Sequence, residues 1–203
     1  MTRQDHDGRL PLHRALNDTV DAADTQAFLE TQLNYARQAK DIEVMTRQDD
    51  NGHLPLHLAL QDNHASLGAI KLLVNRASLG AIKLLVNGNI DALRVSDHHG
   101  LIPLHIACQC RTVDVVKYLV EFDASCLEIC DAINHFPIHH ACRQGDCAIV
   151  NYLLKKSITS VSERNVGGDL PIELLFDASV NQDSIEYTEA IWRLMKAYPE
   201  VLG

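Results

Sequence analysis

Apolar residues recur along the chain in a short pattern that returns five times. Each copy has an apolar residue, a proline and a second apolar residue, and four of the five continue with histidine. The copies occupy residues 10–13, 54–57, 102–105, 136–139 and 170–173. Their prolines are separated by 44, 48, 34 and 34 residues, so the last three copies keep a strict period. Repetition at a period of roughly 20 to 50 residues is typical of solenoids, in which each unit packs on its neighbours.

Each copy predicts the start of a helix, because proline has a φ angle suited to the first helical turn and lacks an N–H that would have no partner there. A residue that tolerates positive φ stands two positions before each copy, which predicts a tight turn. These residues are Gly8, Gly52, Gly100, Asn134 and Gly168. A second apolar helix is expected after the first, over residues 25–40, 113–120, 147–154 and 184–198, and the fifth first helix is expected near residues 171–177.

A turn, a glycine, Pro-Leu-His-x-Ala and two helices at this period resemble the ankyrin repeat family, over nearly the whole chain and most specifically over residues 97–155. The resemblance implies an all-α ankyrin-repeat solenoid of stacked helix-turn-helix units joined by β-hairpin-like turns. We expect one domain of five repeats, with bounds near 4–47, 48–95, 96–129, 130–163 and 164–203. The family commonly has threonine before the proline, whereas this chain has Leu, Ile or Phe, so the usual hydroxyl cap is expected to be absent. Glu173 replaces the histidine in the fifth copy.

The second repeat contains a tandem duplication: residues 65–75 and 77–87 both read ASLGAIKLLVN. An offset of 12 residues rotates a helix by about 1,200°, three turns plus about 120°, so the two copies cannot face the same groove from one straight helix. We expect a long helix with a rotated second stripe, a break into two helices, or one extruded copy, with two registers close in free energy. Divergent repeats rarely keep eleven identities, so the duplication is recent or engineered, and we favour engineered.

Composition and charge indicate which cellular compartment and which class of partner to expect. The chain has 18 basic and 27 acidic residues, a net charge of −9, which argues against nucleic acid as a partner. The polar N-terminus is unlike a secretory signal and no apolar run approaches 18 residues, so we expect no membrane insertion. Six cysteines without such a signal favour a reducing compartment, and we expect an intracellular protein, cytoplasmic or nuclear.

Two sets of side chains could in principle bind metal or carry catalysis. The recurrent histidines keep step with the repeat, so we interpret them as residues that hydrogen-bond the turn and the neighbouring repeat; they are His13, His57, His105 and His139. The six cysteines, with His105, His139 and His140, have spacings that do not match one another as zinc ligands would. Cys108 and Cys142 fall where a first helix needs a small buried residue. Because known catalytic motifs are also missing, we expect no cofactor, no metal and no enzymatic activity.

Function is therefore expected to reside in the surface. The resemblance implies a protein–protein interaction scaffold, a monomer, that binds a protein partner on the concave face of the array. The hairpin tips on that face are His6, Asp7, Asp50, Asn51, His98, His99, Ala132, Ile133 and Val166. The ends of the first helices are Asn17, Asp18, Gln61, Asp62, Gln109, Arg143 and Gln144. Acidic residues in the first two repeats favour a partner with basic groups at that end.

Two other functions remain open at this stage. The duplication is compatible with an engineered variant, made to study insertion tolerance or register switching. Residues 46–49 repeat residues 2–5, so the chain begins inside a connector. That start favours, weakly, a regulatory fragment of a larger enzyme or channel.

Overall fold

The computed structural model describes residues 4–11, 13–14, 47–60, 90–110, 113–178 and 184–198, together with Thr31 and Val86. The chain divides into two compact units, Met1–His98 and His99–Gly203. All regular secondary structure in these described ranges is helical, with no strand. The all-α prediction is confirmed.

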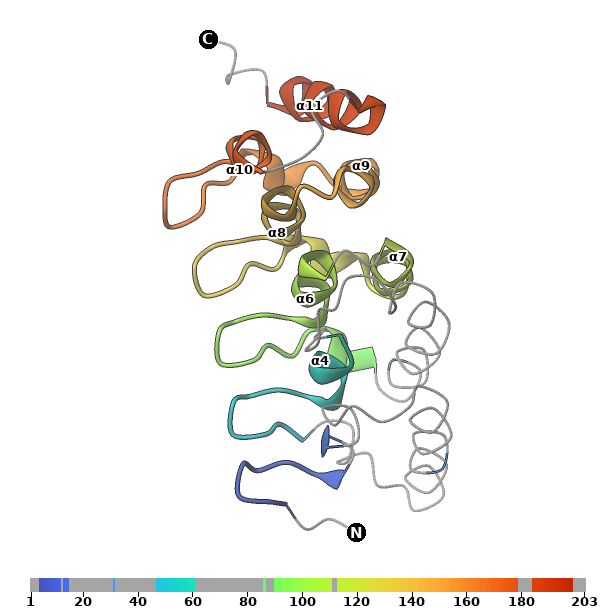
Figure 1. Cartoon of the computed structure of the whole chain (residues 1–203), viewed down its shortest axis with the longest axis vertical. Coiled ribbons are helices and arrows are strands. Elements are labelled where there is room, and N and C mark those ends of the chain that lie inside the picture. Colours follow the sequence, from blue (N-terminus) through green and yellow to red (C-terminus); the bar gives the residue numbers. More distant parts are fainter. Residues whose placement is uncertain are drawn as a thin grey trace. The chain divides into compact units, whose positions relative to one another are not determined.

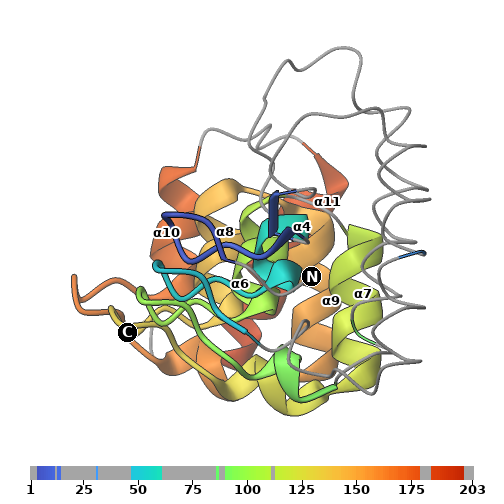
Figure 2. The ribbon, with the colours of Figure 1, turned by 90° about the horizontal axis from the view of Figure 1, so that it is seen from below.

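The second unit consists of two rows of helices (Figure 1). The first helices are α6 (Pro103–Gln109), α8 (Pro137–Gln144) and α10 (Pro171–Asp177), and α8 packs between the other two. The second helices are α7 (Val113–Phe122), α9 (Cys147–Lys156) and α11 (Ile185–Ala197), and α9 packs between the other two. Figure 2 shows that the loops preceding α6, α8 and α10 project on one side of the unit, with α7 and α9 on the other.

Local chemistry sets the helix bounds. Each first helix begins at its proline, and α10 spans the predicted residues 171–177. The Asp146 side chain accepts a hydrogen bond from the N–H of Ile149 (3.0 Å) and so caps α9. Ser184 caps α11 in the same way through the N–H of Tyr187 (3.1 Å). The second helices predicted over residues 113–120, 147–154 and 184–198 are confirmed, and α7 and α9 each extend two residues beyond the predicted end.

Short 3-10 helices, which the sequence pattern did not predict, follow the second helices. They are η2 (Ala124–Glu128) after α7 and η3 (Thr159–Ser162) after α9. Each turns the chain back toward the next hairpin. Cys126 and Val161, one in each of these turns, are buried, so the turns also complete the core between the two rows.

Apolar side chains that line the space between the helices form the core of the second unit. Cys108 and Cys142 are fully buried on α6 and α8, as predicted for small residues of a first helix. Burial raises the pKa of both thiols, so they remain protonated.

The first unit contains α4 (Pro55–Leu60) and the 3-10 helix η1 (Ile90–Leu93). Leu54 and Leu56 are buried in its core, and so is Leu93. Apart from Thr31 and Val86, the helix expected over residues 25–40 and the duplicated segments 65–75 and 77–87 lie outside the described residues. Across the described ranges, each helix is too short or too polar to cross a membrane.

Candidate functional site

In the first, second, fourth and fifth repeats, the side chain of the first hairpin residue holds the hairpin. The Asp131 Oδ1 atom accepts hydrogen bonds from the N–H groups of Ile133 (3.0 Å) and His135 (2.8 Å), and the Asp131 N–H donates to the carbonyl of His135 (2.9 Å). Asp5, Asp49 and Asn165 bond their own hairpins in the same way. Burial acts to raise the pKa of Asp131, but the N–H donors outweigh it, so this pKa is lowered and the residue is an anion at neutral pH.

Positive φ at the predicted position completes the turn. Gly100 has φ +78° and Asn134 has φ 59°, which confirms asparagine as the substitute for glycine in the fourth hairpin. In these four hairpins the turn geometry therefore comes from two residues, the side-chain acceptor at the first position and the positive-φ residue three positions later.

Successive hairpin tips are joined by one main-chain hydrogen bond at each step. The donor N–H and acceptor carbonyl pairs are Asp50 to Asp7 (3.1 Å) and His98 to Asn51 (3.2 Å) in the first unit, and Ala132 to His99 (3.1 Å) and Val166 to Ile133 (3.0 Å) in the second. The tip residues predicted from the sequence are all exposed. Within each unit, the structure thus brings the predicted tips together as a line of side chains on a bonded backbone.

The recurrent histidine links its helix start to the base of the next hairpin. His105 is fully buried; its Nδ1 accepts from the N–H of Ile102 (3.0 Å), and its Nε2 donates to the carbonyl of Ile129 (3.1 Å). His139 bonds Phe136 and Glu163 in the same way, and His13 bonds Leu10 and His53. The predicted role in ordering the turn and the neighbouring repeat is confirmed for these three.

These histidines are neutral. Burial lowers the pKa of His105 to about 3 and that of His139 to about 4, and it also lowers the pKa of His13. Both ring nitrogens of each are used in hydrogen bonds to the main chain. They are structural residues of the repeat.

The apolar residue before each proline cannot supply a hydroxyl cap. The residue two positions after the proline supplies a hydrogen-bond acceptor instead. In the third repeat the imidazole of His105 is the acceptor for the free N–H of Ile102. In the fifth repeat Glu173 takes this role: its Oε2 accepts from the N–H of Leu170 (2.6 Å) and lies 3.3 Å from the Arg164 guanidinium. Glutamate at this position therefore preserves the cap but not the bond to a following hairpin.

The predicted helix-end residues differ in how available they are. Arg143 is exposed, and Gln144 is partly exposed. Gln109 is half-buried, and its amide Nε2 lies 3.1 Å from Nδ1 of His140, so this side chain already has an internal partner. Asn17, Asp18, Gln61 and Asp62 lie outside the described residues.

Sequence reasoning missed an exposed apolar side chain on a first helix of the second unit. Phe176, near the end of α10, is 49% exposed, although it stands in register with the buried Cys108 and Cys142. Ile133 (49%) and Val166 (73%) are exposed tip residues. The repeat register alone gave no signal that Phe176 is exposed, because the same position is buried in the third and fourth repeats.

The paired helices, bonded hairpins and interlocking histidines define a helical repeat protein. A sequence profile described as "Ankyrin repeats (3 copies)" matches residues 26–121 and 73–165, more than half of the chain. The chain belongs to the ankyrin repeat family. Repeats of this family are generally protein–protein interaction modules and typically non-enzymatic. No curated protein matches the chain at a significant level.

Proposed function

We propose that the protein is a non-enzymatic scaffold that binds a protein partner through its tip face. The tip face is defined as the exposed hairpin tips together with the helix-end residues Gln109, Arg143, Gln144 and Phe176. The observation that carries the proposal is the line of exposed tip side chains whose backbones are bonded from one hairpin to the next.

A bonded backbone suits such a surface to binding. Ordering a loop and its side chains on association costs free energy, and a loop that is already held in place avoids much of that cost. The fourth hairpin is held at its first residue by Asp131 and at its tip by two neighbours, since Ala132 donates to His99 and Val166 donates to Ile133. The tips can therefore present side chains to a partner without first being ordered.

The two units offer different chemistry. In the first unit Asp7 and Asp50 are exposed, and the Asp7 carboxylate lies 3.4 Å from the Arg9 guanidinium, so Asp50 is the less neutralised of the two. In the second unit the tips of the last two hairpins are the apolar Ile133 and Val166. We infer a partner that offers basic groups to the first unit and an apolar surface to the second, where burial supplies most of the affinity.

Photo-crosslinking from defined positions tests this proposal. A photoreactive amino acid placed at Ile133 is expected to capture a specific partner from intracellular extract, while one placed at Ile158, also exposed (57%) but in the segment after α9, is not. Purified partner should then bind Val166→Ser more weakly than wild type and Ile158→Ser unchanged. A partner that crosslinks from residue 158 and binds Val166→Ser normally would contradict the tip-face proposal.

The identity of the duplicated segments supports a second, compatible proposal. Eleven residues repeated without a difference indicate a recent or engineered insertion into an otherwise ordinary second repeat. Removing residues 77–88 would leave a spacing of 36 between the second and third prolines, close to the later period of 34. That shortened protein should fold and bind the same partner; loss of folding would show that the second copy is integral to the repeat.

A further inference from the structure

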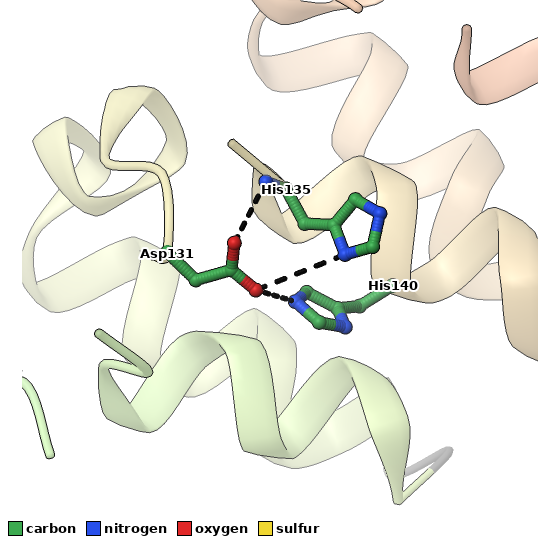
Figure 3. A group of neighbouring side chains, drawn as sticks. All are labelled: Asp131, His135 and His140. Carbon is green, nitrogen blue, oxygen red and sulfur yellow. Dashed lines mark hydrogen bonds and ion pairs between the residues drawn. The ribbon is translucent and has the colours of Figure 1, made fainter. Parts of the chain in front are cut away.

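Three buried side chains of the fourth repeat converge on one point (Figure 3). The Asp131 Oδ2 atom lies 3.0 Å from Nε2 of His140 and 3.8 Å from Nδ1 of His135, and the three ligand-type atoms all lie within 4.8 Å of one another. The exposed fractions of the Asp131, His135 and His140 side chains are 3%, 5% and 7%. Asp131 and His135 come from the hairpin, and His140 comes from α8.

The repeat pattern does not account for this cluster. Asp131 holds its hairpin through Oδ1, so the turn makes no use of Oδ2 in its two side-chain bonds. The position of His140 is occupied by Leu58, Ile106 and Leu174 in the second, third and fifth repeats. An imidazole costs more to bury than these apolar side chains, so the fourth repeat carries a polar residue that the fold itself does not need.

His135 has a buried nitrogen without a partner in the described part of the chain. Its Nε2 lies 2.8 Å from the Asn165 Nδ2, whose amide orientation is set because Oδ1 of Asn165 accepts from the N–H of Asp169 (2.8 Å). The ring hydrogen therefore lies on Nδ1, which points into the cluster at a distance too long for a hydrogen bond to Asp131. A buried polar atom left this way calls for an explanation beyond packing.

Although the sequence predicted no metal site, we propose that Asp131, His135 and His140 bind a divalent transition-metal ion of the zinc class, through Oδ2, Nδ1 and Nε2 respectively. Two imidazoles and one carboxylate are a ligand set that such ions take, with a fourth position left for water or another donor. Bonds of about 2.0–2.2 Å in a tetrahedral arrangement separate the ligand atoms by about 3.3 Å. The two separations from Asp131 Oδ2, 3.0 and 3.8 Å, lie on either side of that value.

Binding rearranges hydrogens without removing any. Each imidazole already has the neutral form that a metal requires, because one nitrogen of each ring accepts a hydrogen bond from an amide. Asn165 Nδ2 lies 2.8 Å from Nε2 of His135, and Gln109 Nε2 lies 3.1 Å from Nδ1 of His140. On binding, the ring hydrogen of each moves to its other nitrogen, which then needs an acceptor. For His140 that acceptor is the amide oxygen of Gln109, after rotation of its side chain. For His135 it is the oxygen of Asn165, which gives up its bond to Asp169, so the site joins the fourth hairpin, α8 and the fifth hairpin.

Metal titration of the full chain tests the proposal. Protein stripped with a chelator is titrated with Zn²⁺ by calorimetry, and with Co²⁺ by visible absorption, because cobalt reports the ligand type. We expect one ion per chain, a saturable rise in Tm, and a tetrahedral or five-coordinate cobalt spectrum without thiolate charge transfer. A spectrum without thiolate charge transfer would exclude the accessible cysteines, Cys110 and Cys130, as ligands of the ion.

Two variants remove a ligand and keep the fold. Asp131→Asn retains the side-chain oxygen that holds the turn, as Asn165 does in the fifth hairpin. His140→Leu introduces the residue found at this position in the second and fifth repeats. Each should weaken Zn²⁺ binding by at least about 100-fold, more than the loss of a residue that only orients a ligand.

His53→Gln is the matched control. His53 stands at the position of His135 in the second repeat, with Nδ1 3.3 Å from Asp49, but Leu58 replaces the third ligand there. The His53→Gln variant should bind Zn²⁺ with the same affinity as the wild-type protein. The proposal fails if zinc binding is absent or not stoichiometric, if both ligand variants bind as wild type does, or if the cobalt spectrum shows thiolate ligands; the cluster is then only a buried hydrogen-bonded group.

Discussion

Replacing His105 by leucine tests whether the recurrent histidine holds each helix start to the next hairpin. The imidazole is fully buried and bonds two main-chain groups, the N–H of Ile102 and the carbonyl of Ile129. Leucine has a similar volume and no polar atom, so both groups lose their partner. A buried main-chain group left unsatisfied costs about 1–3 kcal/mol. The variant should therefore lower the free energy of unfolding by about 2–6 kcal/mol.

Glu173→Leu is the matched comparison, because Glu173 occupies the same position in the fifth repeat. Its side chain is 45% exposed, and it bonds only one main-chain group, the N–H of Leu170. Water can replace part of that bond, and the exposed pair with Arg164 contributes little. A loss of about 1 kcal/mol is expected, well below that of the third repeat.

Urea unfolding measures both changes. Far-UV circular dichroism follows the whole chain, and fluorescence of the single tryptophan, Trp192 on α11, follows the second unit. Coincident transitions allow the free energies to be compared directly. A loss below about 1 kcal/mol in His105→Leu, or an equal loss in the two variants, would refute the assignment of the histidine as the link between repeats.

Acid pH should weaken the fold through its buried histidines. Burial lowers the pKa of His105 to about 3 and of His139 to about 4, whereas histidines in the unfolded chain titrate near 6.5. The free energy of unfolding should therefore be highest above about pH 7 and fall by about 1.4 kcal/mol per pH unit per histidine between pH 6.5 and 4, and urea unfolding that does not change over that range would contradict this expectation. Gly100→Ala should lower Tm more than Gly168→Ala, because both have positive φ but only at Gly100 would the new Cβ lie 2.5 Å from a neighbouring main-chain nitrogen, that of Ala132. Replacing four acidic residues of the first two repeats by serine should slow association with the natural partner at low salt; the residues are Asp7, Asp18, Asp50 and Asp62. An unchanged association rate in stopped-flow mixing would argue against electrostatic steering.

The elements that depend on local chemistry were predictable. Proline at the first helical turn placed the starts of α6, α8 and α10, and the preceding positive-φ residue placed the turns, asparagine at position 134 included. Recurrence in step with the repeat also gave the right role to His105, since a residue required at every unit is one that the fold uses.

Features that depend on a neighbouring repeat were not predictable in the same way. His140 and Asp131 are nine positions apart, and His135 reaches its amide partner Asn165 only because the fifth hairpin stacks on the fourth. The one available signal was a histidine where three other repeats have Leu or Ile. The exposure of Phe176 had no such signal, because its register position is buried in the repeats before it.

Amide hydrogen exchange at the tips of the second unit tests most directly whether the tip face is pre-ordered by bonds between repeats. The N–H groups of Ala132 and Val166 donate to the preceding hairpin although both side chains are exposed. If bonds between hairpins pre-order the tips, both amides exchange slowly in the free protein, and Gly100→Ala accelerates exchange at Ala132 before it does so at Val166. Exchange at both tips as fast as in an unstructured chain would show that the tips are not pre-ordered.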